Sequence, residues 1–449
     1  MTLAVSPEFL ALAAIVLLVL GVFFVRIPVA VLLGLLGFGG YALLDGVDRA
    51  VSMTGNEVWA TFSGYGLTVV PLFILMGQLC YHSGLSERLY TAVHAWAGHR
   101  RGGIAVATLL ACGAFSAICG SNTATAATMS AVALPQMRRY RYHPVLATGT
   151  VAAGTTLGVI IPPSVVAIVV GVQTSSSIQR LFLAGVTPGL VLLAAFLLTI
   201  AVLARHHPDW APAGEKTAWA ARWRASSGLV EAGLLFALVI AGMSLGFFTP
   251  TEAGAAGTAL AALLGFGVGR LNLRGCVQAC GESLGISAMI FLLMAGASMF
   301  GKFLTLTRLP FTLADAIAAL SVSSWVVLAL IALIYLIGGM LMDSLALLVV
   351  TIPIFFPLAD KMGWDPLWFS LFLIVITSMG AITPPVGVAG YVVSAMSGHE
   401  GQGGTRVPLA QVFRGAAAFL PSFGFCLALM ALLPRLVTWL PDWVHPLGG

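Results

Sequence analysis

Charged residues are what this sequence lacks most. Asp, Glu, Lys and Arg make up 8% of its 449 residues, whereas a soluble domain carries about 25%. Hydrophobic residues make up 59% of the chain, and the mean hydropathy is +1.02. Because so few charges cannot cover the surface of a water-soluble fold, the composition excludes a soluble protein and predicts a multi-pass membrane protein.

Sequence signatures of metal sites and of nucleic-acid binding are also missing. The 8 histidines show no metal-ligand spacing, and the motif HExxH does not occur. Of the 6 cysteines, only Cys276 and Cys280 lie one helical turn apart. Two cysteines without further ligands are a weak signal for a metal site. The basic residues form no long run, so we expect no nucleic-acid partner. These absences favour a protein that is not an enzyme.

Apolar segments long enough to cross a bilayer fill most of the chain. Two further apolar stretches, 102–137 and 324–359, are each interrupted near the middle, by GSNT at 120–123 and by GGMLMDS at 338–344. Each stretch is long for one helix and short for two full spans, so both predict re-entrant helical hairpins. The continuous segments predict ten spans, at 8–24, 26–44, 68–84, 145–172, 181–204, 229–247, 251–270, 285–304, 366–396 and 411–434.

The positions of the basic residues predict the orientation in the membrane. Five arginines flank the first hairpin: Arg100, Arg101, Arg138, Arg139 and Arg141. Because basic loops stay in the cytoplasm, this hairpin is expected to enter from the cytoplasmic side and return to it. Counting spans from there places the polar segment 205–228 in the cytoplasm and both termini in the periplasm. The second hairpin is then expected to enter from the periplasm.

The sequence contains an internal repeat. GVIIPPS at 158–164 and GAITPPV at 380–386 lie 222 positions apart, and at this offset all four prolines of 121–165 meet a proline. Since proline is about 5% of residues, such agreement has a chance probability of about 10⁻⁵ per offset. Five predicted spans separate the copies, and an odd number inverts the second copy. Inverted repeats, each with a hairpin and a broken helix, are typical of secondary transporters with a binding site near the midplane.

Two pairs of prolines predict where the broken helices unwind. Pro162 and Pro163, and their counterparts Pro384 and Pro385, cannot continue a helix. The spans 145–172 and 366–396 are therefore expected to break at 158–163 and 380–385. A hairpin tip that faces an unwound helix offers free carbonyls to a cation and free amides to an anion.

The hairpin tips carry the candidate polar side chains. The offset of 222 places Ser121 and Asn122 of the first tip opposite Asp343 and Ser344 of the second. Asp343 is the sole acid inside the second hairpin, and we expect it both to cap a helix and to contact an ion or substrate. For Glu252, the sequence Thr249-Pro-Thr-Glu252 instead predicts a capping box at the start of a helix.

These motifs resemble the large membrane subunit of tripartite ATP-independent periplasmic (TRAP) transporters. The resemblance covers nearly the whole chain and is most specific in GSNTATAATM, AAGTTLGVIIPPS, FTPTEAG and DSLALLVVTIPIFFPL. It implies an elevator-type secondary transporter of the ion transporter superfamily, driven by sodium (Na⁺) in the bacterial inner membrane. The partners would be a small membrane subunit and a periplasmic substrate-binding protein. The substrate would be an organic acid, commonly a carboxylate of the C4-dicarboxylate or sialic acid class.

The resemblance also implies the residues of the binding sites. The first sodium ion would be held by Ser116, Cys119, Gly158, Ile161 and Pro163, and the second by Gly339, Gly380, Thr383 and Val386. The substrate would lie near Ser121, Asn122, Thr125 and Asp343. A stand-alone sodium/dicarboxylate symporter also uses Ser-Asn-Thr hairpins and is the alternative; it would need no binding protein.

Together these patterns divide the chain into six parts: scaffold spans at 1–84 and 229–284, repeats at 85–204 and 285–434, a cytoplasmic loop at 205–228, and a C-terminal tail at 435–449.

Overall fold

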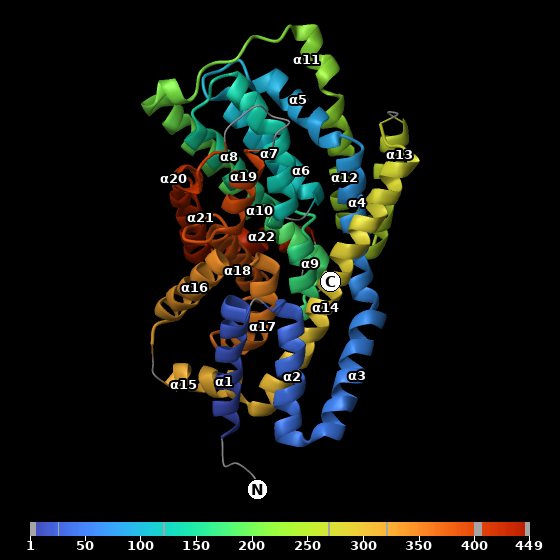
Figure 1. Ribbon diagram of the computed structural model, residues 1–449, viewed down its shortest axis with the longest axis vertical. Coiled ribbons are helices and arrows are strands. Elements are labelled where there is room, and N and C mark those ends of the chain that lie inside the picture. The colour runs from blue at the N-terminus through green and yellow to red at the C-terminus, as the bar shows by residue number, and fades with distance from the viewer. Residues whose placement is uncertain are drawn as a thin grey trace.

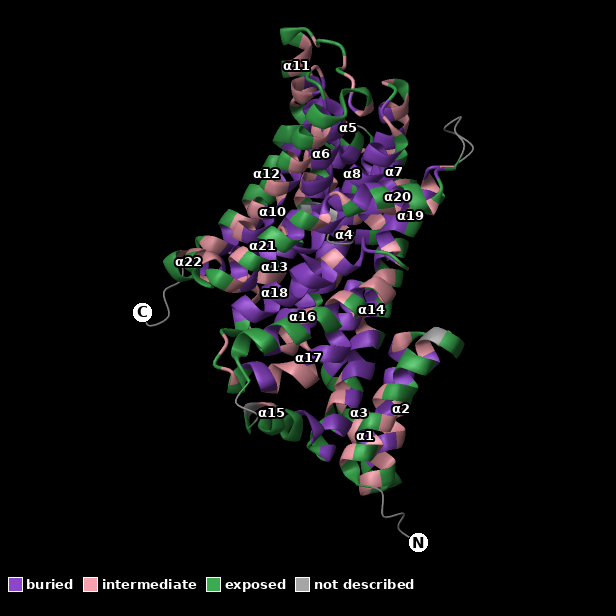
Figure 2. Cartoon of the chain, turned by 90° about the vertical axis from the view of Figure 1, so that its left-hand side faces the viewer, coloured by how far each residue is buried: buried purple, intermediate pink, exposed green. Residues whose placement is uncertain are grey.

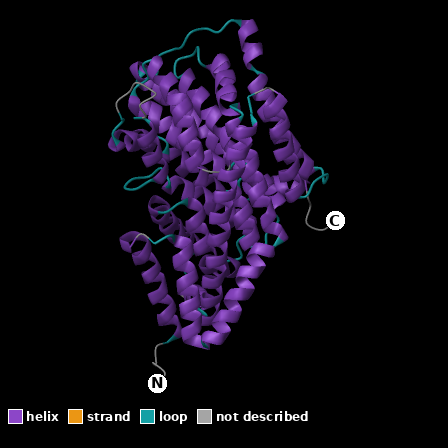
Figure 3. Cartoon of the chain, turned by 45° about the vertical axis from the view of Figure 1, so that its right-hand side comes forward, coloured by secondary structure: helices purple, strands orange, loops and turns teal. Residues whose placement is uncertain are grey.

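The computed structural model describes residues 6–25, 27–119, 122–267, 270–319, 322–398 and 406–444. Within these residues the fold is all-α, as the sequence predicts, and contains no strand (Figure 3). Among the described helices, 7 segments are long and apolar enough to cross a membrane, and five shorter apolar helices accompany them. The prediction of an all-α multi-pass membrane protein is confirmed.

The internal repeat extends over most of the fold. Adding 222 to the bounds of α7 (Asn122–Arg139) gives 344–361, which are the bounds of α17 (Ser344–Lys361). The same offset pairs six further helices to within three residues: α1 (Pro7–Leu20) with α12 (Ser227–Ser244), α2 (Val29–Asp45) with α13 (Pro250–Gly267), α5 (Leu85–Ala97) with α15 (Leu309–Ala319), α6 (Gly103–Cys119) with α16 (Ser324–Leu341), α8 (Pro144–Thr155) with α18 (Pro366–Gly380), and α9 (Val165–Gln173) with α19 (Val388–Met396).

The two halves are inverted relative to each other. Helix α5 lies near one end of the long axis of the molecule, and its counterpart α15 lies near the other end (Figures 1 and 2). The sequence revealed the repeat only around the hairpins and the broken helices. The structure adds the helices of the predicted scaffold segments 1–84 and 229–284, so every part of the first half up to α9 has a counterpart.

The halves differ most clearly in the helices that follow α2 in the first half and α13 in the second. The first half has two helices, α3 (Val47–Ser63) and α4 (Val69–His82), separated by the 3₁₀ turn η2 (Tyr65–Thr68). The second half has the single 35-residue helix α14 (Leu273–Thr307), which is longer than the predicted span 285–304. A Cβ added at Gly37 of α2 would lie 2.6 Å from the backbone nitrogen of Phe300. Helices α2 and α14 therefore pack backbone to backbone, as small residues allow in membranes.

The C-terminal region confirms one prediction and corrects another. The predicted span 411–434 agrees with the apolar candidate span Leu409–Leu432, which a short turn divides into α20 (Leu409–Ala417) and α21 (Leu420–Leu432), with Pro421 in the first turn of α21. The predicted tail 435–449 begins with another helix, α22 (Arg435–Val444). This helix packs against α10 (Ile178–His206), where Trp439 Nε1 donates to Thr187 Oγ1 over 3.1 Å. The helix α22 thus belongs to the folded core.

The polar segment 205–228 is packed against the helices rather than extended. It contains the short helices η4 (Pro208–Trp210) and α11 (Trp219–Ala225). The ring of Trp210 stacks on His143 at a centroid distance of 4.5 Å, and Trp96 of α5 packs against Trp219 at 5.5 Å. Helix α5 is also joined to α12 by an ion pair in which Arg88 Nη2 lies 2.5 Å from Glu231 Oε2.

The predicted capping box at the start of α13 is confirmed. The amide of Thr249 donates to Glu252 Oε2 over 2.8 Å, and the amide of Glu252 donates to Thr249 Oγ1 over 3.3 Å. We expect Thr249→Ala to lower the free energy of unfolding by about 1 kcal/mol, because it removes the capping hydroxyl. Thermal unfolding in detergent measures this change. The control is Thr251→Ala in the same turn; equal losses from both variants would contradict the capping role.

Candidate transport site

Two helical hairpins meet near the middle of the molecule. In the second hairpin, α16 and α17 are joined through Met342 and Asp343, and Asp343 Oδ2 accepts a hydrogen bond from the Leu345 amide over 3.1 Å. Asp343 is therefore the N-cap of α17, as predicted. In the first hairpin, α7 begins at Asn122. Gly120 and Ser121, at the tip between α6 and α7, lie outside the described residues.

Both broken helices unwind where the prolines predict. After α8, the 3₁₀ turn η3 (Thr156–Val159) ends the first half-helix, and Ser164 caps α9 by accepting from the Ala167 amide over 3.3 Å. In the second repeat α18 ends at Gly380 and α19 begins at Val388. Each break contains a cis peptide bond, Pro162–Pro163 and Pro384–Pro385. The two breaks therefore share a cis Pro–Pro bond at corresponding positions, whereas Ser164 caps α9 and Gly387, with a positive φ, precedes α19.

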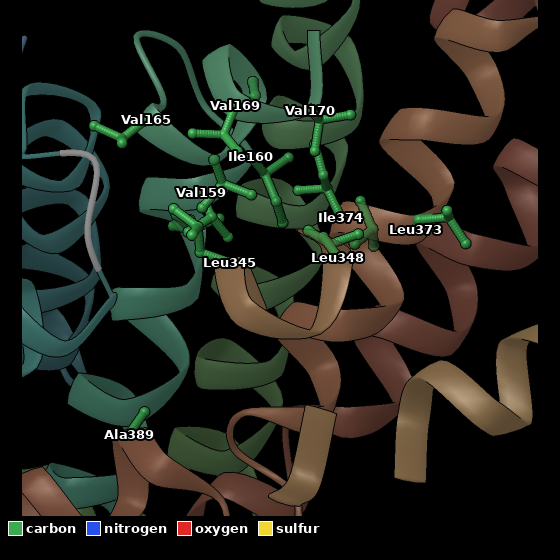
Figure 4. Close-up of a cluster of buried hydrophobic side chains, with 14 of the residues drawn as sticks. Val159, Ile160, Val165, Val169, Val170, Leu345, Leu348, Leu373, Ile374 and Ala389 are labelled. Atoms are coloured by element: carbon green, nitrogen blue, oxygen red, sulfur yellow. The ribbon is translucent and has the colours of Figure 1, made fainter. Parts of the chain in front are cut away.

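Each hairpin packs against the broken helix of the other half. Helix α17 contacts α9, and α7 contacts α19. Figure 4 shows Val165 and Val169 of α9 on the side of Leu345 and Leu348 of α17. Hydrogen bonds reinforce both contacts: Gln173 Nε2 donates to the Val349 carbonyl over 3.2 Å, and the Arg138 guanidinium donates to the Ser397 carbonyl. The hairpins and broken helices thus form one interlocked body.

This body is the most densely buried part of the molecule. Every residue of α8 from Val145 to Thr155 is buried, and so is every residue of α18 from Leu367 to Ser378. Figure 2 shows these buried residues gathered at the centre, with exposed residues on the outer helices. Dense burial fixes the positions of the unwound segments, which would otherwise be too irregular to survive at membrane depth.

The structure brings together residues of the first predicted sodium site. Ser116 of α6 is fully buried, and its hydroxyl has no hydrogen-bond partner among the described residues. It lies directly against the first break, since a Cβ added at Gly158 would be 2.5 Å from Ser116 Cβ. Ile161 and Pro163 lie in the same break. Cys119 is the last residue of α6, and its side chain lies outside the described residues.

The second predicted sodium site is a backbone contact between α16 and the second break. A Cβ added at Gly380 would lie 2.7 Å from Gly339 Cα. The Thr383 hydroxyl donates to the Met379 carbonyl over 2.6 Å, so it is already engaged in its own helix end. Val386 is half-buried in the same break. A cation here would have to be held by backbone oxygens, the type of ligand that the resemblance implies.

A cavity of about 720 Å³ separates the hairpin tips from the scaffold helices. Its volume falls in the range of about 300–1,000 Å³ that is usual for small-molecule sites. One wall carries Asn122, Thr123, Asp343 and Ser344 from the two tips, and Val159, Val165, Val166 and Val388 from the two breaks. The opposite wall comes from α2, α4 and α14 and is apolar except for Gln78. The cavity therefore lies between the interlocked body and the scaffold.

Polar atoms beside the cavity have no partner among the described residues. The buried Oδ1 of Asn122 and Oγ of Ser344 form no hydrogen bond. An unsatisfied buried polar group costs about 1–3 kcal/mol, so such groups call for a bound ion or ligand. Among the described residues that line the cavity, Asp343 is the only one of an ionisable type, and none is Lys or Arg. No group of 3 or more His, Cys, Asp or Glu side chains gathers among the described residues.

The predicted substrate residues differ in their relation to the cavity. Asn122 and Asp343 line it, whereas Thr125 is fully buried, does not line it, and has an unpartnered hydroxyl. Sequence reasoning missed Gln78, which lies in the middle of the predicted span 68–84. Its signal was present: it is the only amide side chain in that apolar segment.

Comparison with known proteins identifies the family. The model of the tripartite ATP-independent periplasmic transporter, DctM component, matches residues 12–436. The C4-dicarboxylate TRAP transporter large permease protein DctM of Pseudomonas aeruginosa is 32% identical over 417 residues, which cover 90% of this chain and 93% of the relative. The sialic acid TRAP transporter large permease protein SiaM of Vibrio cholerae is 31% identical, over 94% of this chain and 96% of the relative.

A solved structure has the same fold. The YdaH transporter of Alcanivorax borkumensis superposes with a TM-score of 0.62 and 17% sequence identity, over 99% of this chain and 100% of that one. That likeness concerns the fold alone. On the family match and the two relatives, this chain belongs to the DctM family, the large membrane component of tripartite ATP-independent periplasmic transporters.

Proposed function

We propose that this chain carries an organic acid across the bacterial inner membrane by sodium-coupled secondary transport. It would act as the large subunit of a tripartite transporter, with a small membrane subunit and a periplasmic substrate-binding protein. The observation that carries the proposal is the meeting of both hairpins and both broken helices, from inverted halves, at one cavity with unsatisfied polar atoms. This arrangement suits a binding site that opens alternately to the two sides of the membrane.

Sodium coupling is supported by the contacts between hairpins and breaks. The unpartnered hydroxyl of Ser116 beside Gly158 is suited to ligate one cation. The backbone contact of Gly339 with Gly380 lets helix-end carbonyls approach a second cation. Helix C-termini carry partial negative charge, so both places favour a small cation without any acidic side chain.

The substrate class is supported by the relatives and by the cavity. Two relatives are named for C4-dicarboxylate and sialic acid, and both compounds are carboxylates small enough for a cavity of about 720 Å³. The N-termini of α7 and α17 point their partial positive charge toward the hairpin tips. An anion would therefore be held by these helix ends, by Asn122 and Ser344, and by the bound sodium ions.

An elevator movement is supported by the division of the cavity walls. The interlocked body supplies one wall, and α2, α4 and α14 supply the other. A rigid body of hairpins and broken helices that slides along a fixed scaffold would carry the bound ions and substrate with it. We propose that the chain works in this way.

Dependence on a binding protein tests the tripartite assembly. The chain and its small membrane partner are reconstituted in proteoliposomes. Uptake of labelled succinate and sialic acid is then measured with and without the periplasmic substrate-binding protein of the same transporter. We expect uptake only when the binding protein is present. Uptake of equal rate without it would contradict the tripartite proposal and support the stand-alone sodium/dicarboxylate symporter instead.

Gln78 is expected to contribute to substrate affinity. It is the only polar side chain that α2, α4 and α14 present to the cavity. Loss of one hydrogen bond costs about 1 kcal/mol, so Gln78→Leu should raise the half-saturating substrate concentration roughly fivefold. The matched control is Gln136→Leu in α7, because Gln136 does not line the cavity. If both variants keep wild-type affinity, Gln78 does not contact the substrate.

A further inference from the structure

A second cavity lies outside the interlocked body, between two helices that pack against it, and away from the proposed transport site. It is a groove of about 720 Å³ between α10 and α21. Its walls are small and apolar, with Ala194 and Ala195 on one side and Ala418 and Pro421 on the other. Ala418 lies in the turn between α20 and α21 and Pro421 in the first turn of α21, so the groove runs past this turn.

The two helices that form the groove run antiparallel. Thr199 lies opposite Ser422, and their hydroxyl oxygens are 2.8 Å apart. On α10 the groove extends from Val191 to Leu203, which at a rise of about 1.5 Å per residue is about 18 Å. Since the two hydroxyls satisfy each other, the inside of the groove offers no free polar group to a ligand.

The groove opens toward the region that lipid chains occupy. Helix α10 has the highest mean hydropathy of the described candidate spans, 2.5, and only 28% of that window is buried. On the rim of the groove, the side chain of Leu198 is 65% exposed and that of Phe425 is 58% exposed. Side chains of this kind stay exposed in a membrane protein only where lipid tails or another apolar surface covers them.

Basic residues gather at the cytoplasmic end of the groove. Arg205 follows Leu203 by two residues and is exposed. Arg414 of α20 lies near the same end, because a Cβ added at the next residue, Gly415, would touch the carbonyl oxygen of Val145, two residues after His143. His143 stacks on Trp210, and Trp210 stacks on His207, which directly follows α10. The chain of contacts therefore brings Arg414 to the end of α10 that carries Arg205.

We propose that this groove binds an acyl chain of an anionic phospholipid, whose phosphate lies between Arg205 and Arg414. The length of about 18 Å is close to the depth of one leaflet, which is about half of the roughly 30 Å hydrocarbon core. Basic clusters at the cytoplasmic ends of membrane helices bind anionic headgroups. The apolar groove and the basic end thus match the two parts of one lipid molecule.

Photo-crosslinking tests the proposal directly. The complete complex, with its small membrane subunit, is placed in nanodiscs that contain phosphatidylglycerol with a photoreactive diazirine in one acyl chain. After illumination, labelled peptides are mapped by mass spectrometry. We expect labelling concentrated in 191–203 and 418–429. Labelling spread evenly over all lipid-facing helices would overturn the proposal. It would also be overturned if these peptides were labelled in the large subunit alone but not in the complete complex, because the small subunit would then cover the groove.

Matched variants separate the acyl chain from the headgroup. Ala194→Phe fills the groove and should reduce labelling of these peptides several-fold, whereas Ala259→Phe on the exposed face of α13 should leave it unchanged. Replacing both Arg205 and Arg414 by Gln should reduce labelling by phosphatidylglycerol but not by the zwitterionic phosphatidylcholine. Equal labelling by the two lipids in the unmodified protein would overturn the role given to the arginines.

Discussion

Gly380→Ala is expected to reduce sodium-dependent uptake at least tenfold. The added Cβ would lie 2.7 Å from Gly339 Cα and from its carbonyl carbon, and 2.8 Å from the carbonyl oxygen of Leu336. All three are backbone atoms, so no side chain can turn away to make room. Helices α16 and α18 would have to separate, at a cost typical of overpacking, about 1–3 kcal/mol. The proposed second sodium site would lose its geometry.

The control for this prediction is a glycine with open space. At Gly233 of α12, nothing lies within 4 Å of an added Cβ, and Gly→Ala in a helix gains up to about 1 kcal/mol. Gly233→Ala should therefore transport normally. The folded fraction of the Gly380→Ala variant is first isolated by size-exclusion chromatography. The sodium concentration that gives half-maximal uptake is then measured for this fraction and for the wild type. If that concentration equals the wild-type value, the contact between Gly339 and Gly380 does not form a sodium site.

Asp343→Asn is expected to reduce uptake about tenfold or more without changing thermal stability. Asn caps a helix as well as Asp does, so the hydrogen bond to the Leu345 amide is preserved. The variant loses only the ionisable carboxyl, the sole one among the described residues that line the cavity. Asp343→Ala loses both the charge and the cap, and should also lower the free energy of unfolding by about 1 kcal/mol.

Asp365 is the matched control for Asp343. It caps α18 by accepting a hydrogen bond from the Trp368 amide over 2.9 Å, but it does not line the cavity. Asp365→Asn should therefore keep both stability and uptake. Normal uptake by Asp343→Asn together with impaired uptake by Asp343→Ala would show that Asp343 acts only as a helix cap.

The parts of the fold that sequence reasoning predicted are those with a strong local signal. Single prolines such as Pro135 and Pro188 lie inside helices, but the two consecutive prolines at Pro162 and at Pro384 end one, so each break could be located within a few residues. Thr249 and Glu252 form a capping box whose geometry depends on four consecutive residues. In each case, neighbouring residues alone decide the backbone conformation.

The missed features depend on contacts between distant segments. The repeat of α1 in α12 and of α2 in α13 was missed because its sequence signal is weak. At the offset of 222, Pro28 before α2 meets Pro250 at the start of α13, but side chains that face lipid can be exchanged for others of similar hydropathy. Helix α3 was missed because it is amphipathic and not continuously apolar. Gln78 could be seen as unusual, but only the packing of α4 against α6, α9 and α14 places it in the cavity.

The substrate site was predicted only in outline for the same reason. Asn122 and Asp343 could be chosen because they interrupt apolar segments, and both line the cavity. Thr125 follows Ser121 by one helical turn, so the sequence alone could not exclude Thr125 from the substrate site. Its burial away from the cavity is decided by the packing of α7 against the neighbouring helices.

The most direct test of the account is the ion dependence of uptake. Proteoliposomes with the chain, its small membrane partner and the binding protein are given an inward gradient of sodium, or of potassium at equal ionic strength, at the same pH on both sides. The account predicts that labelled substrate accumulates only with the sodium gradient. Accumulation should stop when a sodium ionophore abolishes this gradient. Equal uptake in potassium, or uptake driven by a proton gradient without sodium, would contradict it.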